Sequence, residues 1–231
     1  MSRRVVVTGA NRGIGFAIAK HFSTKGDSVV ALCRSSSIVL DRVAESIVIA
    51  DFSDLDSIDR ICEQLGDVDV LVNNAGFQNG HGLDQYDCNS MKQIFSVNLW
   101  FPVILTHRLV KSLSRNRNGR VVMNTSIAGQ IGHPDVWYGA SKAGLINATK
   151  SLARSYGGLG VSINAIAAGP TETDMMEQIP LSRREALKAA AISGRFAMPS
   201  EVASVVYWLA TECPDYVNGS TIDVNNGMFM R

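Results

Sequence analysis

The chain has 231 residues, 46% of them hydrophobic and 19% charged, which is enough apolar material to bury one substantial core. Its 22 lysines and arginines nearly balance 21 acidic residues for a net charge of +1, so neither nucleic acid nor an anionic membrane is expected as a partner. No apolar stretch reaches the roughly 20 residues of a membrane span and the N-terminus lacks a signal-peptide pattern, so we expect a cytoplasmic protein.

Short runs rich in β-branched residues predict strands along the whole chain. They are Val5–Thr8, Ser28–Cys33, Ser46–Ala50, Val68–Asn73, Gly119–Thr125, Val161–Ala167 and Thr221–Val224. Several carry apolar residues at consecutive positions, which is typical of strands covered on both faces.

Longer segments with helical periodicity alternate with these runs. They are Ile14–Lys25, Asp54–Leu65, Asn89–Asn116, Val136–Tyr156, Ser182–Ile192 and Pro199–Thr211. Between Cys33 and Ser46 only about a dozen residues remain, so that crossover helix must be very short or absent. The alternation predicts an α/β fold over residues 1–231: a single Rossmann-type, doubly wound domain with a seven-stranded, mainly parallel sheet and helices on both faces.

A glycine-rich turn follows the first predicted strand. It reads TGANRGIG, with Gly9, Gly13 and Gly15 in the spacing G-x-x-x-G-x-G and a predicted helix directly behind it. Glycine allows a close backbone approach to a pyrophosphate, and the helix start offers free N–H donors. The context favours a phosphate-binding turn, although a plain tight turn has the same composition.

Two arginines indicate which nucleotide is preferred. The second predicted strand ends in Cys33 and Arg34, where an NAD-binding protein usually has an acidic residue for the ribose 2′-hydroxyl. Arg12 lies inside the glycine turn, so the two guanidinium groups are placed to bind a 2′-phosphate. We therefore predict NADP(H) rather than NAD(H); the alternative is that both are ordinary surface arginines.

A possible catalytic pair lies at the start of a predicted helix. Tyr138 and Lys142, in WYGASKAG, are four residues apart and so share one helix face. A nearby ammonium favours a phenolate and lowers the pKa of the tyrosine. Such a pair also occurs by chance in helices.

Together with the glycine turn, the motifs NNAG at 73–76, VNL around Asn98, NTS ending at Ser126 and YGASK at 138–142 resemble the short-chain dehydrogenase/reductase family. Further similar segments are NAIAAGPTETDM at 164–175 and NGSTIDVNNGM at 218–228. The resemblance runs in order along nearly the whole chain. It implies an enzyme that transfers hydride between a nicotinamide and a carbonyl or alcohol.

The resemblance implies four catalytic residues. Tyr138 is expected as general acid for a carbonyl oxygen, Ser126 as its hydrogen-bonding partner, and Lys142 as a ligand of the nicotinamide ribose that also lowers the pKa of Tyr138. Asn98 is expected to fix the helix geometry and a proton-relaying water. The loop before Tyr138 is one residue shorter than is usual in the family, so Thr125 stays an alternative to Ser126.

The remaining implied roles belong to the cofactor. The glycine turn is expected to bind the pyrophosphate. Asp51 is expected either to bind the adenine amino group or to be a helix-flanking carboxylate. The NNAG segment is expected to stabilise the sheet and line the adenosine ribose, and Thr171 and Thr173 are expected near the nicotinamide. The full set of predicted cofactor-binding residues is Gly9, Asn11, Arg12, Gly13, Ile14, Gly15, Arg34, Asp51, Phe52, Asn74, Ala75, Gly76, Tyr138, Lys142, Gly169, Thr171 and Thr173.

The substrate is the least determined feature. The tail NGMFM and the run at 193–210 look like those of family members that reduce 3-oxoacyl thioesters on acyl carrier protein. Such a thioester or a similar ketone is therefore the leading hypothesis. The alternatives are an NAD-dependent secondary-alcohol dehydrogenase and a non-catalytic NADP(H)-binding sensor or scaffold. His133, between the serine and the tyrosine, either touches substrate or faces solvent.

Three further expectations concern assembly, closure and metals. The two long helices resemble those through which family members pair, so a homotetramer or homodimer is expected. A segment at about 175–195 is a candidate substrate lid. The four cysteines lie far apart with no Cys-x-x-Cys pair and no ligand spacing is found, so we expect free thiols and no metal.

Overall fold

We describe the fold from a computed structural model, which describes residues 2–79, 82–177 and 179–230. Within these residues the chain forms one seven-stranded sheet in the order β3-β2-β1-β4-β5-β6-β7, and every pair of neighbouring strands is parallel. The strands are β1 (Arg4–Thr8), β2 (Ser28–Cys33), β3 (Ser46–Ile49), β4 (Val70–Asn73), β5 (Gly119–Ser126), β6 (Val161–Ala168) and β7 (Thr221–Val224). The predicted α/β class with seven strands is confirmed, and the sheet is parallel throughout.

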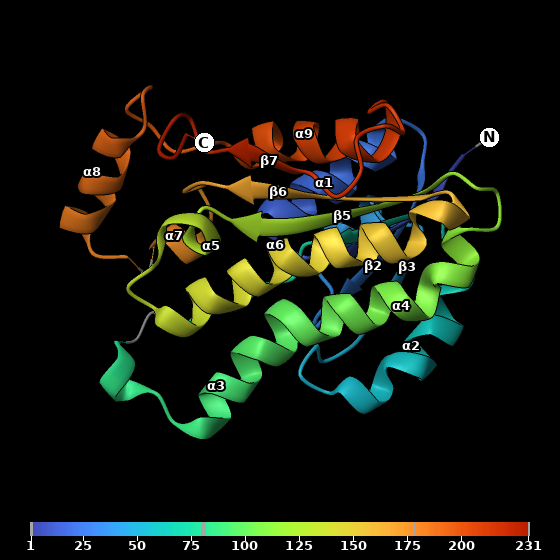
Figure 1. The fold of residues 1–231 in the computed structure, drawn as a ribbon, viewed down its shortest axis with the longest axis horizontal. Helices are drawn as coiled ribbons and strands as arrows, with labels where there is room; N and C mark the ends of the chain where they lie inside the picture. The colour runs from blue at the N-terminus through green and yellow to red at the C-terminus, as the bar shows by residue number, and fades with distance from the viewer. Residues whose placement is uncertain (1, 80–81, 178, 231) are drawn as a thin grey trace.

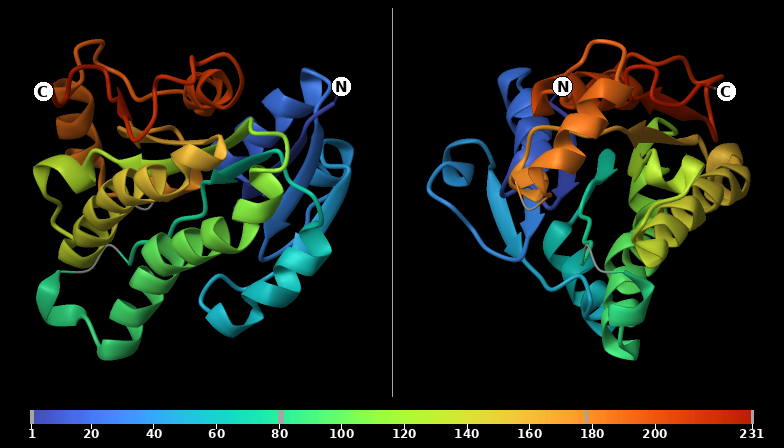
Figure 2. Two further views of the ribbon diagram at one scale, coloured as in Figure 1. Left: turned by 45° about the vertical axis from the view of Figure 1, so that its right-hand side comes forward. Right: turned by 90° about the vertical axis from the view of Figure 1, so that its left-hand side faces the viewer.

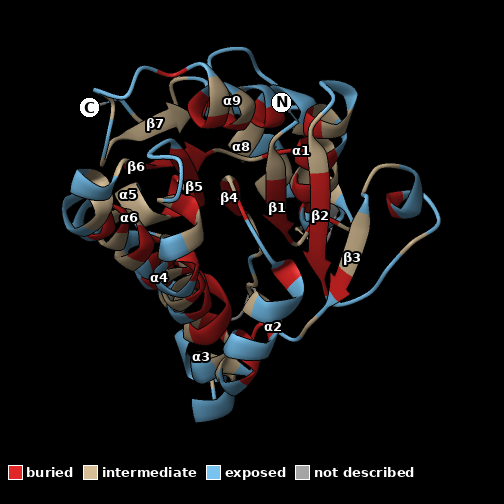
Figure 3. Ribbon diagram, turned by 90° about the vertical axis from the view of Figure 1, so that its right-hand side faces the viewer, coloured by how far each residue is buried: buried red, intermediate tan, exposed pale blue. Residues whose placement is uncertain are grey.

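Helices cover both faces of the sheet, as Figures 1 and 2 show. The first face carries α1 (Gly13–Thr24) and α9 (Pro199–Thr211), and the second carries α2 (Ile58–Leu65), α4 (Phe101–Leu113) and α6 (Val136–Tyr156). Each face has its own apolar core, and Figure 3 shows buried residues concentrated in the strands and on the inward sides of the helices. Strands buried on both faces explain the continuous apolar runs in the sequence.

The remaining elements are short or lie at the ends of the sheet. They are α3 (Cys88–Phe95), η4 (Ser96–Trp100), α5 (Ala128–Ile131), α7 (Asp174–Glu177), α8 (Leu181–Ala190) and the short 3-10 turns η1 (Leu40–Arg42), η2 (Leu55–Ser57), η3 (Leu83–Gln85) and η5 (Gly157–Leu159). The crossover between β2 and β3 contains only η1, as its length predicts. α5 and α7 have four residues each, too few for helical periodicity to become visible in a sequence.

One predicted helix is interrupted. The segment predicted as one helix over 89–116 is α3, then the π-helical turn η4, then α4, which ends at Leu113. A π-helical turn inserts one extra residue without changing the apolar pattern much, which is why periodicity does not detect it. The predicted helix over 54–65 likewise begins as the 3-10 turn η2 and becomes α-helical only at Ile58.

The strand order indicates where a ligand binds. The order of the strands reverses direction at the junction of β1 and β4. In open parallel sheets, ligands bind at such a switch point, beyond the carboxyl ends of the strands. The turns after β1, β4, β5 and β6 all open toward this edge. Among the helices of the described residues, none is long and apolar enough to cross a membrane.

Candidate active site

A cavity of about 800 Å³ opens at this edge of the sheet. Its walls include every predicted cofactor-binding residue and, of the four predicted catalytic residues, Ser126, Tyr138 and Lys142. Asn98 is fully buried and is not part of the wall. The structure therefore brings together residues from seven segments that the sequence separates by up to about 160 positions.

The glycine turn closes tightly around the start of α1. Gly9 has a positive φ of 66°, and a Cβ on Gly15 would lie 2.1 Å from the carbonyl oxygen of Gly9, so only glycine fits at position 15. The residue before α1, Arg12, gives the helix no side-chain cap. The first N–H groups of α1 are thus left available to an anion at the cavity wall.

A hydrogen-bond network ties the turn to the two central strands. The Thr8 hydroxyl accepts from the backbone N–H groups of Asn74 and Ala75, both at 2.9 Å, and the Asn74 side chain donates to the Thr8 carbonyl at 2.9 Å. Asn124 on β5 donates to the Asn74 side-chain oxygen at 2.8 Å. Asn73 points into the core, where its amide donates to Thr106 at 3.1 Å; it supports the sheet and, unlike the sequence-based expectation for the NNAG segment, does not line the cavity.

Lys142 is buried at the centre of the site. Its Nζ donates to the Asn124 carbonyl at 3.0 Å and lies 3.4 Å from where a Cβ on Gly76 would stand. Burial lowers the pKa of this lysine to about 8. An ammonium has three donors, so the hydrogen bond to Asn124 leaves donor capacity toward the cavity.

Tyr138 lies beside Ser126, its predicted hydrogen-bonding partner. Ser126 ends β5, and its hydroxyl hydrogen-bonds the phenol, which lowers the pKa of Tyr138, but burial raises that pKa by more and the buried carboxylate of Asp135 raises it further. Asp135 also caps α6 by accepting the Tyr138 N–H at 3.0 Å. The pKa of Tyr138 is thus raised overall, with burial as the largest cause, and not lowered as the sequence led us to expect. Thr125 donates its hydroxyl to the Ile166 carbonyl at 2.6 Å and is committed to the sheet.

Asn98 supports the site from behind. It lies in the π-helical turn η4, accepts the Phe77 N–H at 2.8 Å and donates to the Phe77 carbonyl at 2.8 Å and to the Ser141 hydroxyl at 3.0 Å. Ser141 in turn donates to the Tyr138 carbonyl at 2.8 Å. Asn98 thus holds the loop after β4 against the first turn of α6.

The two arginines and Asp51 lie at the adenosine end. Arg34 is exposed and lines the cavity beside Asp51, whose pKa is lowered mainly by hydrogen bonds from Ser53 and also by the Arg34 charge. Arg12 instead forms an exposed ion pair with Asp174 of α7 at 3.3 Å. Both predicted roles of Asp51 have support. It accepts hydrogen bonds from Ser53 in its own turn, as a helix-flanking carboxylate would, and it lines the cavity, as a ligand of the adenine would.

His133, which the sequence left either touching substrate or facing solvent, lines the cavity in edge contact with Tyr138, at 5.2 Å between ring centroids. Sequence reasoning missed other parts of the cavity wall. Residues that line it without having been assigned there individually include Ser35, Phe77, Gln78, Gln93, Val97, Asn124, Ile131, Ile179, Arg183 and Leu187. Met175, Met176 and Met228 add apolar side chains to this wall. The four-residue spacing of Arg183 and Leu187 marks one helix face, but nothing in the sequence says where that face points.

The residues present fit a dinucleotide. The cradle that a Cβ on Gly15 would fill, the uncapped start of α1 and the buried Lys142 with spare donors are the groups that a pyrophosphate and a ribose require. Among the described residues no group of three or more His, Cys, Asp or Glu side chains is placed to hold a metal ion.

Fold and site together define a nicotinamide-dependent oxidoreductase, and comparisons with known proteins agree. A family model described as Enoyl-(Acyl carrier protein) reductase matches residues 9–229. The chain is 32% identical to 3-oxoacyl-[acyl-carrier-protein] reductase FabG of Escherichia coli, covering 97% of this chain and 96% of FabG. The chain belongs to the short-chain dehydrogenase/reductase family.

Solved structures of similar fold are also nicotinamide-dependent dehydrogenases. One, provisionally assigned as an NAD(P) dependent gluconate 5-dehydrogenase from Beutenbergia cavernae with bound NADP at low occupancy, has a TM-score of 0.91 at 30% identity and covers 98% of this chain and 96% of its own. A 4-hydroxyisoleucine dehydrogenase complexed with NADH also has a TM-score of 0.91, at 25% identity, and covers 98% of both chains. These neighbours bind different nicotinamide cofactors and act on different substrates, so the family alone decides neither for this chain.

Proposed function

We propose that this oxidoreductase transfers hydride between NADP(H) and a carbonyl or secondary alcohol, and that its substrate is a 3-oxoacyl thioester or a similar ketone. The observation that carries the proposal is that Ser126, Tyr138 and Lys142 line one cavity together with an uncapped glycine turn. When bound, the cofactor supplies the hydride.

The protein supplies the proton and the position. At neutral pH the raised pKa of Tyr138 keeps its phenol protonated, so the hydroxyl is a donor to the oxygen of a carbonyl that is being reduced. Ser126 donates a second hydrogen bond to the same oxygen and stabilises the negative charge that develops there. Lys142 holds the ribose hydroxyls with its spare donors, and its charge helps the phenol to release the proton.

The preference for NADP(H) rests on charge. Arg34 follows β2 without an acidic neighbour in the place where a 2′-hydroxyl is usually bound, and it is exposed to solvent at the cavity wall. Arg12 joins it once its ion pair with Asp174 opens, because a doubly charged phosphate is a stronger partner than an exposed carboxylate. An NAD-dependent alcohol dehydrogenase is the alternative that a cofactor titration decides.

The proposal is tested by NADPH oxidation with a panel of ketones that includes acetoacetyl thioesters. Wild-type protein is compared with Tyr138→Phe, which removes only the proton donor. We expect turnover of at least one ketone and a loss of roughly 100-fold or more in kcat for the variant. Equal rates in the two proteins refute the role of Tyr138, and binding of NADPH without turnover of any ketone favours a sensor or scaffold.

The segment at 175–195 is proposed as a substrate lid. Outside residue 178, which is not among the described residues, Met175, Met176, Ile179, Arg183 and Leu187 line the cavity, and α8 has no buried residue of its own. Such an element can move at little cost in packing. Limited proteolysis tests this: cleavage within the segment should slow when NADPH and substrate are added, and an unchanged rate contradicts closure.

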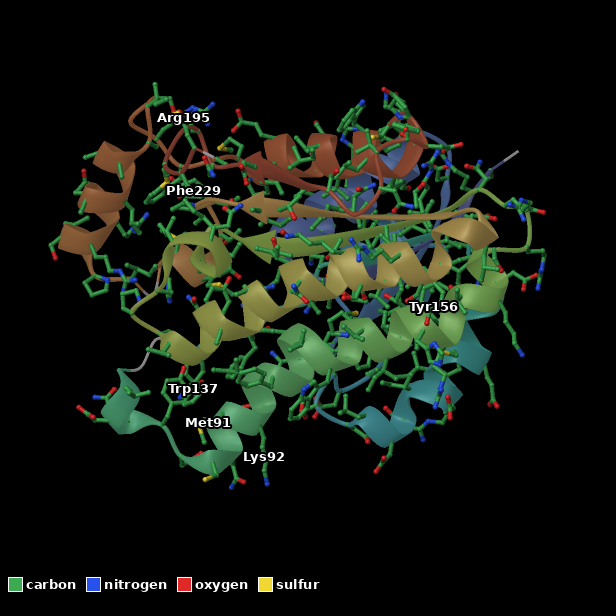
Figure 4. The ribbon with its side chains drawn as sticks, in the orientation of Figure 1. Met91, Lys92, Trp137, Tyr156, Arg195 and Phe229 are labelled. Atoms are coloured by element: carbon green, nitrogen blue, oxygen red, sulfur yellow. The ribbon has the colours of Figure 1, made fainter. Side chains whose placement is uncertain are left out.

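Assembly into a homodimer or homotetramer in the cytoplasm is also proposed, through the long helices α4 and α6, which run side by side (Figure 2). Trp100, in the turn that leads into α4, is 42% exposed. Tyr156 lies near the end of α6 (Figure 4), and its hydroxyl is hydrogen-bonded to Nδ1 of His107 on α4 at 2.6 Å. A second copy of the chain would cover this tryptophan. Light scattering of wild type and Trp100→Glu tests the interface.

A further inference from the structure

The helix α8 contributes a charged side chain to the cavity that the proposed reaction does not use. Arg183 and Leu187 lie four residues apart, hence on one helix face, and both line the cavity. α8 stands at one end of the molecule, apart from the two helix layers (Figure 1). Arg183 therefore belongs to the end of the cavity that receives the substrate.

The other cationic groups of the cavity already have a role in the proposed reaction. Arg12, which pairs with Asp174 at 3.3 Å, and Arg34, which lies beside Asp51, are assigned to the nucleotide, and Lys142, which donates to a carbonyl, is assigned to the ribose. Arg183 forms no ion pair with a carboxylate among the side chains that the structure describes. Its neighbour Arg184 differs, because it faces Glu172 at 3.9 Å and does not line the cavity.

Helix stability does not explain an arginine at this position. Arg183 lies in the first turn of α8, which has no acidic residue, and a cation near a helix N-terminus is opposed by the helix dipole. An anion held by this guanidinium would remove the conflict. The location thus favours a ligand over a structural role.

A second polar group stands on the loop before α6. The Nδ1 of His133 lies 3.1 Å from the backbone nitrogen and 3.3 Å from the carbonyl oxygen of Asp135, so this nitrogen is engaged with the backbone and Nε2 is the ring nitrogen left for a ligand. Burial lowers the pKa of His133, and the nearby charge of Arg183 contributes to the shift. His133 thus places a second polar ring nitrogen near the arginine and is in edge contact with Tyr138.

We propose that Arg183, assisted by His133, binds a carboxylate or phosphate of the substrate, so that the preferred substrate is a ketone carrying an anionic group. The inference rests on the proposed function and names its substrate class. A guanidinium is suited to this task because its planar donors match both kinds of oxyanion in pairs. Arg183 is then a specificity-determining residue, and the reacting oxygen stays with Tyr138 and Ser126.

Matched pairs of neutral and anionic ketones test the proposal. We would compare kcat/KM for ethyl acetoacetate with acetoacetate, dihydroxyacetone with its phosphate, and the N-acetylcysteamine thioester of acetoacetate with acetoacetyl coenzyme A. In the wild type, at least one anionic member should exceed its neutral partner by roughly 10- to 100-fold, the range of one charge-assisted contact. The pair that responds distinguishes a carboxylate on the ketone from the phosphates of a thioester carrier.

Variants identify the residue responsible. Arg183→Gln should abolish the preference through KM with kcat nearly unchanged, Arg183→Lys should restore part of it, and Arg184→Gln is the control that leaves it intact. The proposal is overturned if Arg183→Gln lowers both members of each pair equally or changes neither. It is overturned as well if the wild type prefers no anionic member.

A binding measurement separates this inference from the proposed function. Calorimetric titration of the NADP⁺ complex with malonate and with inorganic phosphate should show roughly tenfold weaker binding to Arg183→Gln than to wild type for at least one of them. If no ketone turns over but binding depends on Arg183, the reductase proposal fails and the anion site stands. If ketones are reduced and binding does not depend on Arg183, the anion site fails and the reductase stands.

Discussion

The Nζ of Lys142 lies 5.9 Å from the centroid of the Tyr138 ring, one helical turn away on α6. Both groups are desolvated, and the consequence is opposite for each: burial lowers the pKa of the lysine to about 8 and raises the pKa of the tyrosine. At neutral pH the pair is an ammonium beside a neutral phenol. This charge state suits donation of a proton, which is the demand of carbonyl reduction.

The first prediction concerns pH. A lysine is charged below its pKa, so the ammonium of Lys142 should be lost as the pH rises through about 8. Because the phenol of Tyr138 remains protonated in this range, the lysine alone should control the alkaline limb of kcat/KM for ketone reduction. Initial rates of NADPH oxidation from about pH 6 to about pH 10 measure the profile. A rate that stays constant across the alkaline range contradicts this role of Lys142.

The second prediction concerns stability. The unfolded chain keeps the Lys142 proton up to a pH of about 10.4, whereas the folded chain keeps it only to about 8. The buried charge therefore opposes folding by up to about 3 kcal/mol at neutral pH, and this opposition is relieved as the pH rises between the two values. Lys142→Met should accordingly raise the free energy of unfolding while abolishing turnover.

Urea denaturation checks this expectation at neutral pH and again near the upper end of that interval, where the advantage of the variant should shrink. Lys150→Met, at an exposed position of the same helix, is the matched control and should change stability by less than about 0.5 kcal/mol. A destabilised Lys142→Met protein would mean that the Asn124 hydrogen bond outweighs the burial of the charge.

The third prediction concerns Asn98. Asn98→Ala removes three hydrogen bonds and leaves the Phe77 backbone groups without their partner, so we expect a loss of about 2–4 kcal/mol in unfolding free energy. Activity should fall as well, because Asn98 fixes the start of α6 through Ser141. Denaturation and kcat are the measurements. The exposed Asn147 provides the control substitution, and equal effects of the two alanine variants would exclude a positioning role for Asn98.

The fourth prediction concerns nucleotide choice. Arg34→Glu places a carboxylate where NAD-binding folds usually have one. The variant should therefore bind NADPH roughly 100-fold or more weakly than the wild type and bind NADH more tightly. Dissociation constants for both nucleotides measure the change. Arg42→Glu, an exposed residue of η1 that does not line the cavity, controls for the added charge. If the Arg34→Glu variant binds NADPH as tightly as the wild type does, Arg34 does not determine the preference for NADPH. That preference then depends on Arg12 or does not exist.

Some parts of the molecule follow directly from local sequence. The bounds of α6 agree with prediction because Asp135 caps this helix. Those of β2 agree because a continuous apolar run, VVALC, defines the strand. The motif residues Ser126 and Tyr138 meet although the loop between them is short. Local pattern and turn chemistry are sufficient at these places.

Other features depend on contacts that a linear pattern does not contain. The π-helical turn around Asn98 leaves the apolar periodicity nearly unchanged. The raised pKa of Tyr138 follows from burial, which only the packed fold determines. The position of Arg183 depends on how α8 is anchored, and that anchor is Asn226, whose backbone and side-chain oxygens accept from Ile192 and Ser193 at 3.0 and 2.9 Å.

The lack of buried side chains in α8 has a consequence for how this enzyme can change. Substitutions on that helix remove no core volume, so they should cost little in folding free energy. The proton donor belongs to α6, and the nucleotide cradle belongs to the turn between β1 and α1. New carbonyl compounds can therefore be accommodated by mutating one peripheral helix, which makes α8 the first place to randomise when the substrate range is to be redesigned.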